Sequence, residues 1–140
     1  MSSFTCQQLD PVMYPLVNKF YQNFKVRGRA KSHDRVWVIK AENQIVAAAK
    51  LSLKDGQFLL SGVFTAPCFR GQKLASRLIK TITLDYRKPF FTFAYNHLVS
   101  WYQSCGFTEH AAPAELAPFF SAYQNQGRQI VCMIANKDCA

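Results

Sequence analysis

Residues 70–75 read Arg-Gly-Gln-Lys-Leu-Ala and follow an apolar run, 58–64, that is typical of a strand. A proline turn separates the two segments, and an amphipathic helical pattern starts near Lys73. A strand, a tight loop and a helix N-terminus together present free backbone N–H groups to an anion, and the helix dipole adds positive charge there. The segment therefore indicates a phosphate site, with an ordinary strand–helix connection as the alternative. It has neither the P-loop spacing nor the dinucleotide fingerprint.

A second informative segment lies at 96–107 and reads Asn-His-Leu-Val-Ser-Trp-Tyr-Gln-Ser-Cys-Gly-Phe. It predicts a short helix that ends at Gly106, a residue suited to the left-handed position after a helix, and a strand that begins at Phe107. The pattern between the two segments predicts a helix over about 72–87 and a strand over 90–94. Both segments thus stand in a defined order of elements.

Together these segments resemble the GNAT superfamily of N-acetyltransferases. Arg70 and Ala75 match the first and last positions of the family motif Gln/Arg-x-x-Gly-x-Gly/Ala, while Lys73 stands where the family usually has its middle Gly. Residues 101–102 (Trp-Tyr) and 106–107 (Gly-Phe) match the late motif aromatic-Tyr-x-x-x-Gly-Phe. The resemblance covers essentially the whole chain.

The fold expected is α/β (α+β), with a GNAT-like mixed, mostly antiparallel central sheet and helices on both faces. The expected order is β-α-β-β-β-α-β-α-β-(α)-β, and a basic loop over 25–34 replaces the family's usual second helix. We expect strands over 4–9, 35–40, 45–53, 57–65, 90–94 and 128–135, and helices over 11–24, 72–87, 98–104 and 117–124.

Two helices carry apolar residues at helical spacing, which predicts that these residues face the core. In the first helix they are Val12, Leu16, Val17, Phe20, Tyr21 and Phe24. In the second they are Leu74, Leu78, Ile79 and Ile82.

The bulk properties fit one folded domain, 1–140, because the 140 residues are 49% apolar and 14% aromatic. No apolar run approaches the roughly 20 residues of a membrane span, and the N-terminus shows no secretory pattern. We therefore expect no membrane partner and a cytoplasmic protein. The five cysteines are scattered without CxxC spacing, which argues against a disulfide framework and against a metal site.

The resemblance implies direct transfer of an acetyl group from acetyl-CoA, the co-substrate, to a primary amine, without a covalent enzyme intermediate. It implies that the pyrophosphate binds the backbone of 70–76, and that the pantetheine arm lies along 63–65, where the family's strand is bulged and splays from the next strand. The cofactor-binding residues so implied are Val63, Phe64, Thr65, Arg70, Gly71, Gln72, Lys73, Leu74, Ala75, Ser76 and Asn96.

The resemblance also implies catalytic roles. The backbone N–H of Phe64 would polarise the thioester carbonyl, and Tyr102 would protonate the leaving thiolate, with a packing role for Tyr102 as the alternative. Many members carry a catalytic Glu on the fourth strand, but 57–65 has no acidic residue. His97 is the best side chain for the general base, with a structural role as the alternative. A water chain stays open as the base, as do His33, Asp34, Glu109 and His110.

Two other functions stay open on sequence alone. Lys73 and the missing strand carboxylate motivate a catalytically idle module that binds acyl-CoA or a partner. The net charge of +9 and the basic stretch 25–35 motivate nucleic-acid binding, which is less favoured because aromatic residues are not interleaved there. The amine acceptor is a small molecule or a peptide, and the basic loop mildly favours an acceptor with an acidic group. Many relatives dimerise, so a homodimer also stays open.

Overall fold

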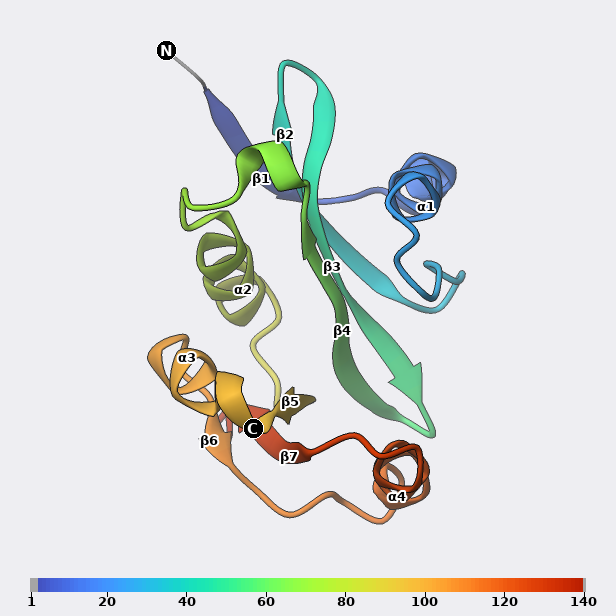
Figure 1. The fold of residues 1–140 in the computed structure, drawn as a ribbon, viewed down its shortest axis with the longest axis vertical. Coiled ribbons are helices and arrows are strands. Elements are labelled where there is room, and N and C mark those ends of the chain that lie inside the picture. The colour runs from blue at the N-terminus through green and yellow to red at the C-terminus, as the bar shows by residue number, and fades with distance from the viewer. Residues whose placement is uncertain (1–2, 140) are drawn as a thin grey trace.

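The computed structural model describes residues 3–139 and contains one seven-stranded sheet with helices on both faces (Figure 1). The sheet order is β1-β2-β3-β4-β5-β7-β6, which confirms the expected mixed, mostly antiparallel sheet. The strands are β1 (Phe4–Gln8), β2 (Arg35–Ala41), β3 (Gln44–Lys54), β4 (Gln57–Thr65), β5 (Phe90–Tyr95), β6 (Thr108–Glu109) and β7 (Ile130–Ala135). The helices are α1 (Tyr14–Asn23), α2 (Leu74–Asp85), α3 (Val99–Ser104) and α4 (Ala117–Asn125).

The helices bury three apolar clusters against the sheet. α2 and α3 pack on one face, while α1 covers β2 and β3 on the other face, and α4 covers β5 and β7 there. The four predicted core residues of α2 are all buried, as expected. Burial of apolar surface stabilises the folded state by roughly 25 cal/mol per Å². The apolar face of each helix therefore determines where that helix packs on the sheet.

The prediction for the first helix was wrong at three positions. Val12, Leu16 and Phe24 are 76%, 48% and 40% exposed. Residues 11–13 form a 3₁₀ turn in which the Asp10 side chain accepts a hydrogen bond from the Val12 N–H. The α-helix begins only at Tyr14 and ends at Asn23, so Val12 and Phe24 lie outside it, and Leu16 flanks its buried face. Val17, Phe20 and Tyr21 are buried as predicted, together with Tyr14.

Two tight turns join β2, β3 and β4 into an antiparallel unit. Glu42 and Asn43 have φ of 52° and 67°, and Asp55 and Gly56 have φ of 48° and 84°. Positive φ at both central residues is the two-residue turn that matches strand twist. The strands expected over 35–40, 45–53 and 57–65 thus pair as two successive hairpins.

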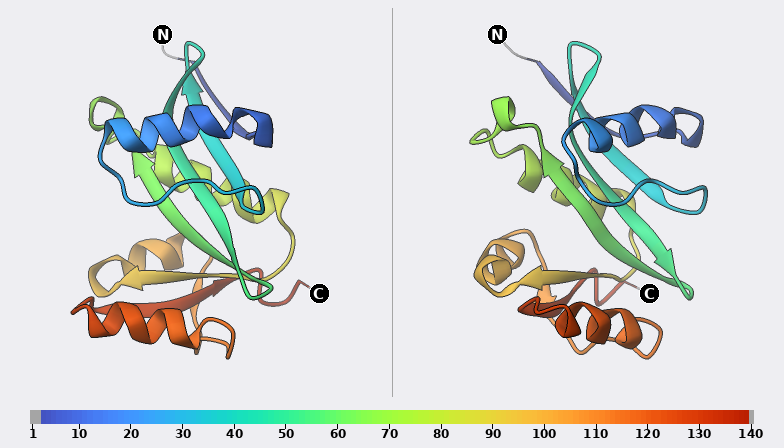
Figure 2. Two further views of the ribbon diagram at one scale, coloured as in Figure 1. Left: turned by 90° about the vertical axis from the view of Figure 1, so that its right-hand side faces the viewer. Right: turned by 45° about the vertical axis from the view of Figure 1, so that its right-hand side comes forward.

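The sheet opens between β4 and β5. These strands pair in parallel only at Leu59–Phe91 and Leu60–Thr92, and β5 then continues with β7. Figure 2 shows the two halves of the sheet diverging from this point. The C-terminal half of β4 is consequently a free edge, as the family resemblance implied.

A β-bulge marks the start of that free edge. The register between β3 and β4 shifts between Ala48 and Lys50, so that β4 carries one extra residue. Gly62 lies in this stretch at φ 65°, and its carbonyl accepts a hydrogen bond from the Tyr21 hydroxyl at 2.7 Å. A glycine suits a bulge that needs positive φ.

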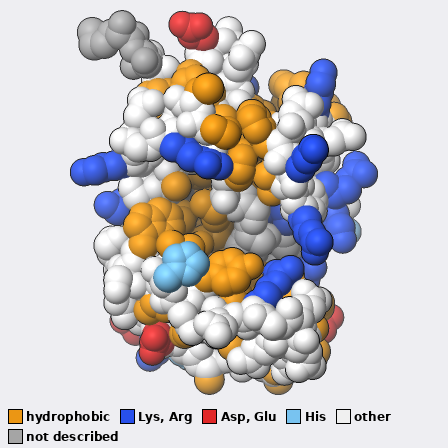
Figure 3. All heavy atoms as spheres, viewed as in Figure 1, with side chains coloured by type: hydrophobic (Ala, Val, Ile, Leu, Met, Phe, Trp, Pro, Cys, Tyr) orange, Lys and Arg blue, Asp and Glu red, His pale blue; other side chains and the backbone are white. Residues whose placement is uncertain are grey.

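The segment 25–34 contains no helix or strand, as predicted. It is fixed to α1 by Asn18, whose side chain exchanges hydrogen bonds with the backbone of Ala30 at 2.7 and 3.2 Å. Figure 3 shows Lys and Arg side chains gathered on the side of the molecule that α1 occupies. Among residues 3–139, no helix is long and apolar enough to cross a membrane.

Candidate functional site

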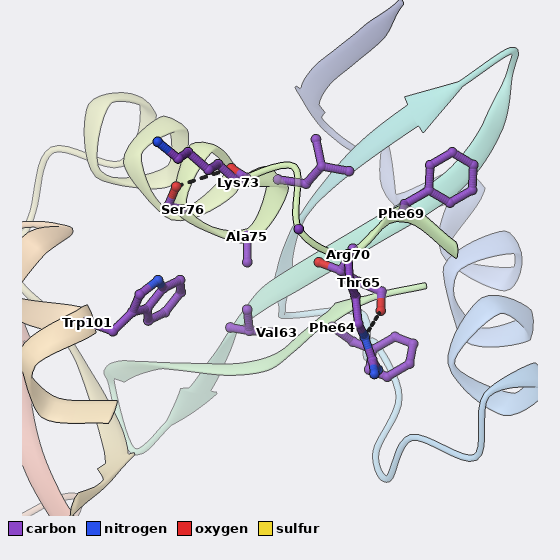
Figure 4. Close-up of a pocket in the computed structure, with 11 residues that line it drawn as sticks. Val63, Phe64, Thr65, Phe69, Arg70, Lys73, Ala75, Ser76 and Trp101 are labelled. Carbon is purple, nitrogen blue, oxygen red and sulfur yellow. Dashed lines mark hydrogen bonds between the residues drawn. The ribbon is translucent and has the colours of Figure 1, made fainter. Parts of the chain in front are cut away.

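A cavity of about 360 Å³ lies between the end of β4 and the start of α2 (Figure 4). The structure brings all the predicted coenzyme residues of 63–65 and 70–76 to its wall, except Gln72. Trp101 completes the wall from α3, and its indole reaches toward Val63 and Ala75 in Figure 4. Trp101 belongs to the late motif, but its role in this wall was not predicted. The lining residues are Val63, Phe64, Thr65, Phe69, Arg70, Gly71, Lys73, Leu74, Ala75, Ser76 and Trp101.

The first turn of α2 opens onto this cavity. No side chain caps this helix start, and no acidic residue lies in its first turn. The first helical hydrogen bond runs from the Arg77 N–H to the Lys73 carbonyl at 3.1 Å, so the amides between them lack helical partners. Unpaired amides and the positive end of a helix dipole form an anion site.

Lys73 precedes the helix with φ 61° and ψ 26°, the left-handed conformation. A lysine thus adopts a conformation that favours glycine, at the position where the family motif usually has its middle Gly. For an L-residue this conformation costs roughly 1–2 kcal/mol. The Lys73 side chain is exposed beside the cavity, where its ammonium adds positive charge.

Arg70 connects the loop to the free edge of β4. Its Nε donates to the Thr65 carbonyl at 3.1 Å, and its guanidinium lies 5.4 Å from the centroid of the Phe64 ring. Figure 4 shows the side chain turned toward these two residues. Arg70 thus fixes the loop that carries the anion site against the strand edge.

The hydrogen-bond ladder decides which peptide groups of β4 face the free edge. The Ala66 N–H donates to the Val46 carbonyl of β3 at 2.8 Å. Because paired residues alternate along an antiparallel ladder, the Phe64 N–H also faces β3. The peptide groups of Thr65 then point to the open side, where the Thr65 carbonyl accepts the hydrogen bond from Arg70.

A second cavity, of about 270 Å³, occupies the opening between β4 and β5. Tyr102 and Thr92 lie in its wall, and Tyr102 is only 8% exposed. Burial raises the pKa of Tyr102 above its usual value, and the neighbouring Thr92 side chain partly offsets this. The hydroxyl therefore keeps its proton at neutral pH and can donate it. Val63 lines both this cavity and the first one.

The structure places Asn96 and His97 elsewhere. Both line a third cavity, of about 420 Å³, together with residues 126–129. The His97 ring stacks on Tyr95, with 6.0 Å between centroids and 25° between planes. Neither residue lies in the wall of the first two cavities.

A fourth cavity, of about 500 Å³, lies beside the second, and we call it the basic cavity. Its floor holds Lys50, which is 7% exposed and had not been predicted as a site residue. The signal was a single lysine inside the apolar strand 45–53. The cavity wall consists of Arg27, Gly28, Arg29, Lys31, Asp34, Lys50, Ser52, Leu53, Lys54, Leu59, Ser61, Gly62, Tyr123, Gln126 and Arg128.

A family model described as an acetyltransferase (GNAT) domain matches residues 32–109. The chain belongs to the GNAT acetyltransferase family. The matched residues contain both GNAT motifs and the whole wall of the first cavity. Acyl transfer from coenzyme A is thus the chemistry of the family. No curated protein sequence matches the chain.

Solved structures support the GNAT fold. Escherichia coli ElaA has 19% identity and a TM-score of 0.63, covering 95% of this chain and 99% of ElaA. The ribosomal-protein-S18-alanine N-acetyltransferase from Escherichia coli has 14% identity and a TM-score of 0.64, covering 95% and 93%. N-acetylglutamate synthase from Neisseria gonorrhoeae, complexed with coenzyme A and N-acetyl-glutamate, has 13% identity and a TM-score of 0.64. That match covers 96% of this chain and 35% of the synthase, so the chain spans about a third of it.

Proposed function

We propose that this GNAT protein transfers the acetyl group of acetyl-CoA directly to a primary amine of a small molecule or peptide. One observation carries the proposal. The free edge of β4 runs from the anion site at the start of α2 to the cavity that holds Tyr102, and Val63 borders both. A single extended molecule with a phosphate end and a reactive end fits this path.

The residues present suit coenzyme A. The pyrophosphate would accept hydrogen bonds from the first-turn amides of α2, near Ala75 and Ser76. The amides of the pantetheine arm would pair with the free edge of β4 at Val63 and with the Thr65 N–H, as an added strand would. Trp101 would close the opposite side.

Acetyl-CoA supplies an acetyl group activated as a thioester. The Phe64 N–H faces β3, so we propose that the neighbouring Val63 N–H, in the bulge of β4, polarises the thioester carbonyl instead. The Tyr102 hydroxyl would protonate the sulfur as the carbon–sulfur bond breaks. The amine nitrogen forms the new amide bond and loses one proton, so the products are an amide and a thiol.

We propose that water accepts the proton of the amine. β4 has no acidic residue, and His97 lies in a separate cavity. Of the other residues considered as the general base, Asp34 lines the basic cavity, beside the second cavity, which we call the slot. Its oxygens accept hydrogen bonds from the Lys31 and Leu53 N–H groups at 3.0 and 3.4 Å, which favours a structural role for this carboxylate.

A catalytically idle module that binds acyl-CoA is the second candidate. The left-handed Lys73 favours it, because a side chain there crowds the approach of a pyrophosphate to the backbone more than glycine would.

Release of free thiol from acetyl-CoA over a panel of amines separates the two functions. The panel includes glutamate and a peptide with an N-terminal alanine, since two structural neighbours are named for such groups. Transfer predicts thiol release that depends on the amine. Saturable binding of acetyl-CoA without release for any amine would instead establish the idle module.

A further inference from the structure

The basic cavity lies directly beside the slot between β4 and β5. The two cavities share five wall residues, which come from β4, from α4 and from the segment that follows α4. These residues are Leu59, Ser61, Gly62, Tyr123 and Arg128. A small molecule in the basic cavity can therefore extend one end into the slot, beside Tyr102.

Positive charge dominates the wall of the basic cavity. Asp34 is the acidic residue of this wall, and two backbone N–H groups already occupy its oxygens. Figure 3 shows the crowding of Lys and Arg on this side of an apolar hollow. Such a concave surface attracts anions and repels cations. The cationic residues are Arg27, Arg29, Lys31, Lys50, Lys54 and Arg128.

Lys50 forms a prepared site at the floor of the cavity. Its Nζ donates to the Ser52 hydroxyl at 2.8 Å and to the Ser61 hydroxyl at 3.0 Å. An ammonium has three donors, so one N–H remains beyond these two bonds. Burial lowers the pKa of Lys50, while the charge of Asp34 raises it. A buried ammonium is costly without a counter-charge, so a bound anion would stabilise it.

Arg128 provides a second donor group at the border between the two cavities. Its guanidinium lies 4.5 Å from the centroid of the Tyr123 ring, so the aromatic face holds it in place. A guanidinium can donate two parallel hydrogen bonds to a carboxylate or phosphate.

We infer that the acceptor is an amine that also carries an anionic group, a carboxylate or a phosphate, which Lys50 and Arg128 bind in the basic cavity. The amine end then lies in the slot. The acetylation of the amine in this inference rests on the proposed acetyl transfer. The binding of the anionic group to Lys50 and Arg128 does not depend on that reaction. A polyamine is disfavoured, because its second ammonium would face the cationic wall.

Calorimetry tests the anion site without any reaction. Succinate and inorganic phosphate, which have no amine, are titrated separately into the protein saturated with coenzyme A. We expect saturable binding of at least one probe, weakened about tenfold or more by Lys50→Met and by Arg128→Gln. Lys19→Met is the matched control, since Lys19 is exposed on α1 and lies outside this cavity. Binding of neither probe contradicts the inference.

Thermal denaturation checks that Lys50→Met folds. If it does not, Arg128→Gln carries the test, because this side chain is half-buried at the cavity border. The probe that binds also identifies whether a carboxylate or a phosphate is preferred.

Turnover with matched amines tests the same inference at the level of reaction. The pairs are β-alanine with its amide, and phosphoethanolamine with ethanolamine, with putrescine as the cationic member. We expect kcat/KM at least about tenfold higher for an anionic member, with the preference lost in Arg128→Gln. A preference for putrescine would overturn the inference and leave the proposed transfer intact. Failure of acetyl-CoA itself to bind would overturn the proposed transfer instead.

Discussion

Tyr102 is the residue whose environment is best suited to proton donation. It is buried in the slot, and this burial raises the pKa of its hydroxyl, which therefore stays protonated at neutral pH. A neutral phenol near a leaving thiolate can lower the barrier without any charge on the enzyme.

We predict that Tyr102→Phe lowers kcat by about 10²-fold, the low end for a general acid, because a thiolate is already a fair leaving group. The affinity for acetyl-CoA should not change. The pH–rate profile of the wild type should fall only above pH 10, and the variant should lack this fall. A wild-type rate that declines near pH 8 would contradict the assignment.

Residues of the site differ in how well the sequence predicts them. The residues from Arg70 to Ser76 were predicted because a strand, a loop and a helix start lie together in the chain. Lys50 was missed because its hydroxyl partners, Ser52 and Ser61, come together only when β3 and β4 pair. Strand register is a tertiary property, so a lone lysine in an apolar strand does not reveal its partners.

The start of α2 is the element on which the proposed coenzyme binding depends. Lys73 holds the left-handed conformation that glycine adopts freely, so the main chain is strained at this position while the Lys73 ammonium adds positive charge beside the cavity.

We predict that Lys73→Gly leaves stability unchanged or raises it by up to about 1 kcal/mol, because relief of the left-handed strain offsets the greater freedom of glycine in the unfolded chain. Lys73→Val should lower stability by about 1 kcal/mol or more, since a β-branched residue fits this conformation poorly. Urea denaturation measures both. Equal stability of the two variants would contradict the conformation described here.

The bulge of β4 is the element that opens the slot. A Cβ added at Gly62 would lie 2.9 Å from the Tyr21 hydroxyl, in a backbone conformation that side chains rarely adopt. We predict that Gly62→Ala destabilises the protein by roughly 1–3 kcal/mol. The matched control is Gly127→Ala, which also has positive φ but no atom within 4 Å. Thermal denaturation of both variants separates the effect of backbone strain alone from the added effect of the clash with Tyr21. An equal loss of stability in the two variants would contradict a role for Tyr21.

At the scale of the whole molecule, the fold was predicted more completely than the site. The order of strands and helices follows from local patterns and tight turns. The basic cavity could not be predicted from such local patterns, because loop 25–34, β3 and the segment after α4 meet only in the folded chain. The first helix shows the same limit, since the 3₁₀ turn at 11–13 places Val12 outside the α-helix and away from its buried face.

The pH dependence of stability tests the burial of Lys50 and Tyr21. The folded pKa of Lys50 lies below 10.5, so between the two values the unfolded chain binds more protons and stability rises with pH. Burial raises the pKa of Tyr21, so above pH 10 the unfolded chain ionises first and stability falls. We predict that Lys50→Met gains more stability over the wild type at pH 7 than at pH 10, measured by urea denaturation. A gain that is the same at both values would contradict the buried position of the ammonium.

The central claim, that the start of α2 and the free edge of β4 hold coenzyme A, is tested most directly by calorimetric titration with acetyl-CoA. Three proteins are compared: the wild type, Ala75→Glu in the cavity wall, and Ala122→Glu on the exposed surface of α4. We predict saturable binding by the wild type and by Ala122→Glu, and binding at least about tenfold weaker for Ala75→Glu, because its carboxylate repels the pyrophosphate. Unchanged affinity in Ala75→Glu, or no binding by the wild type, would contradict the claim.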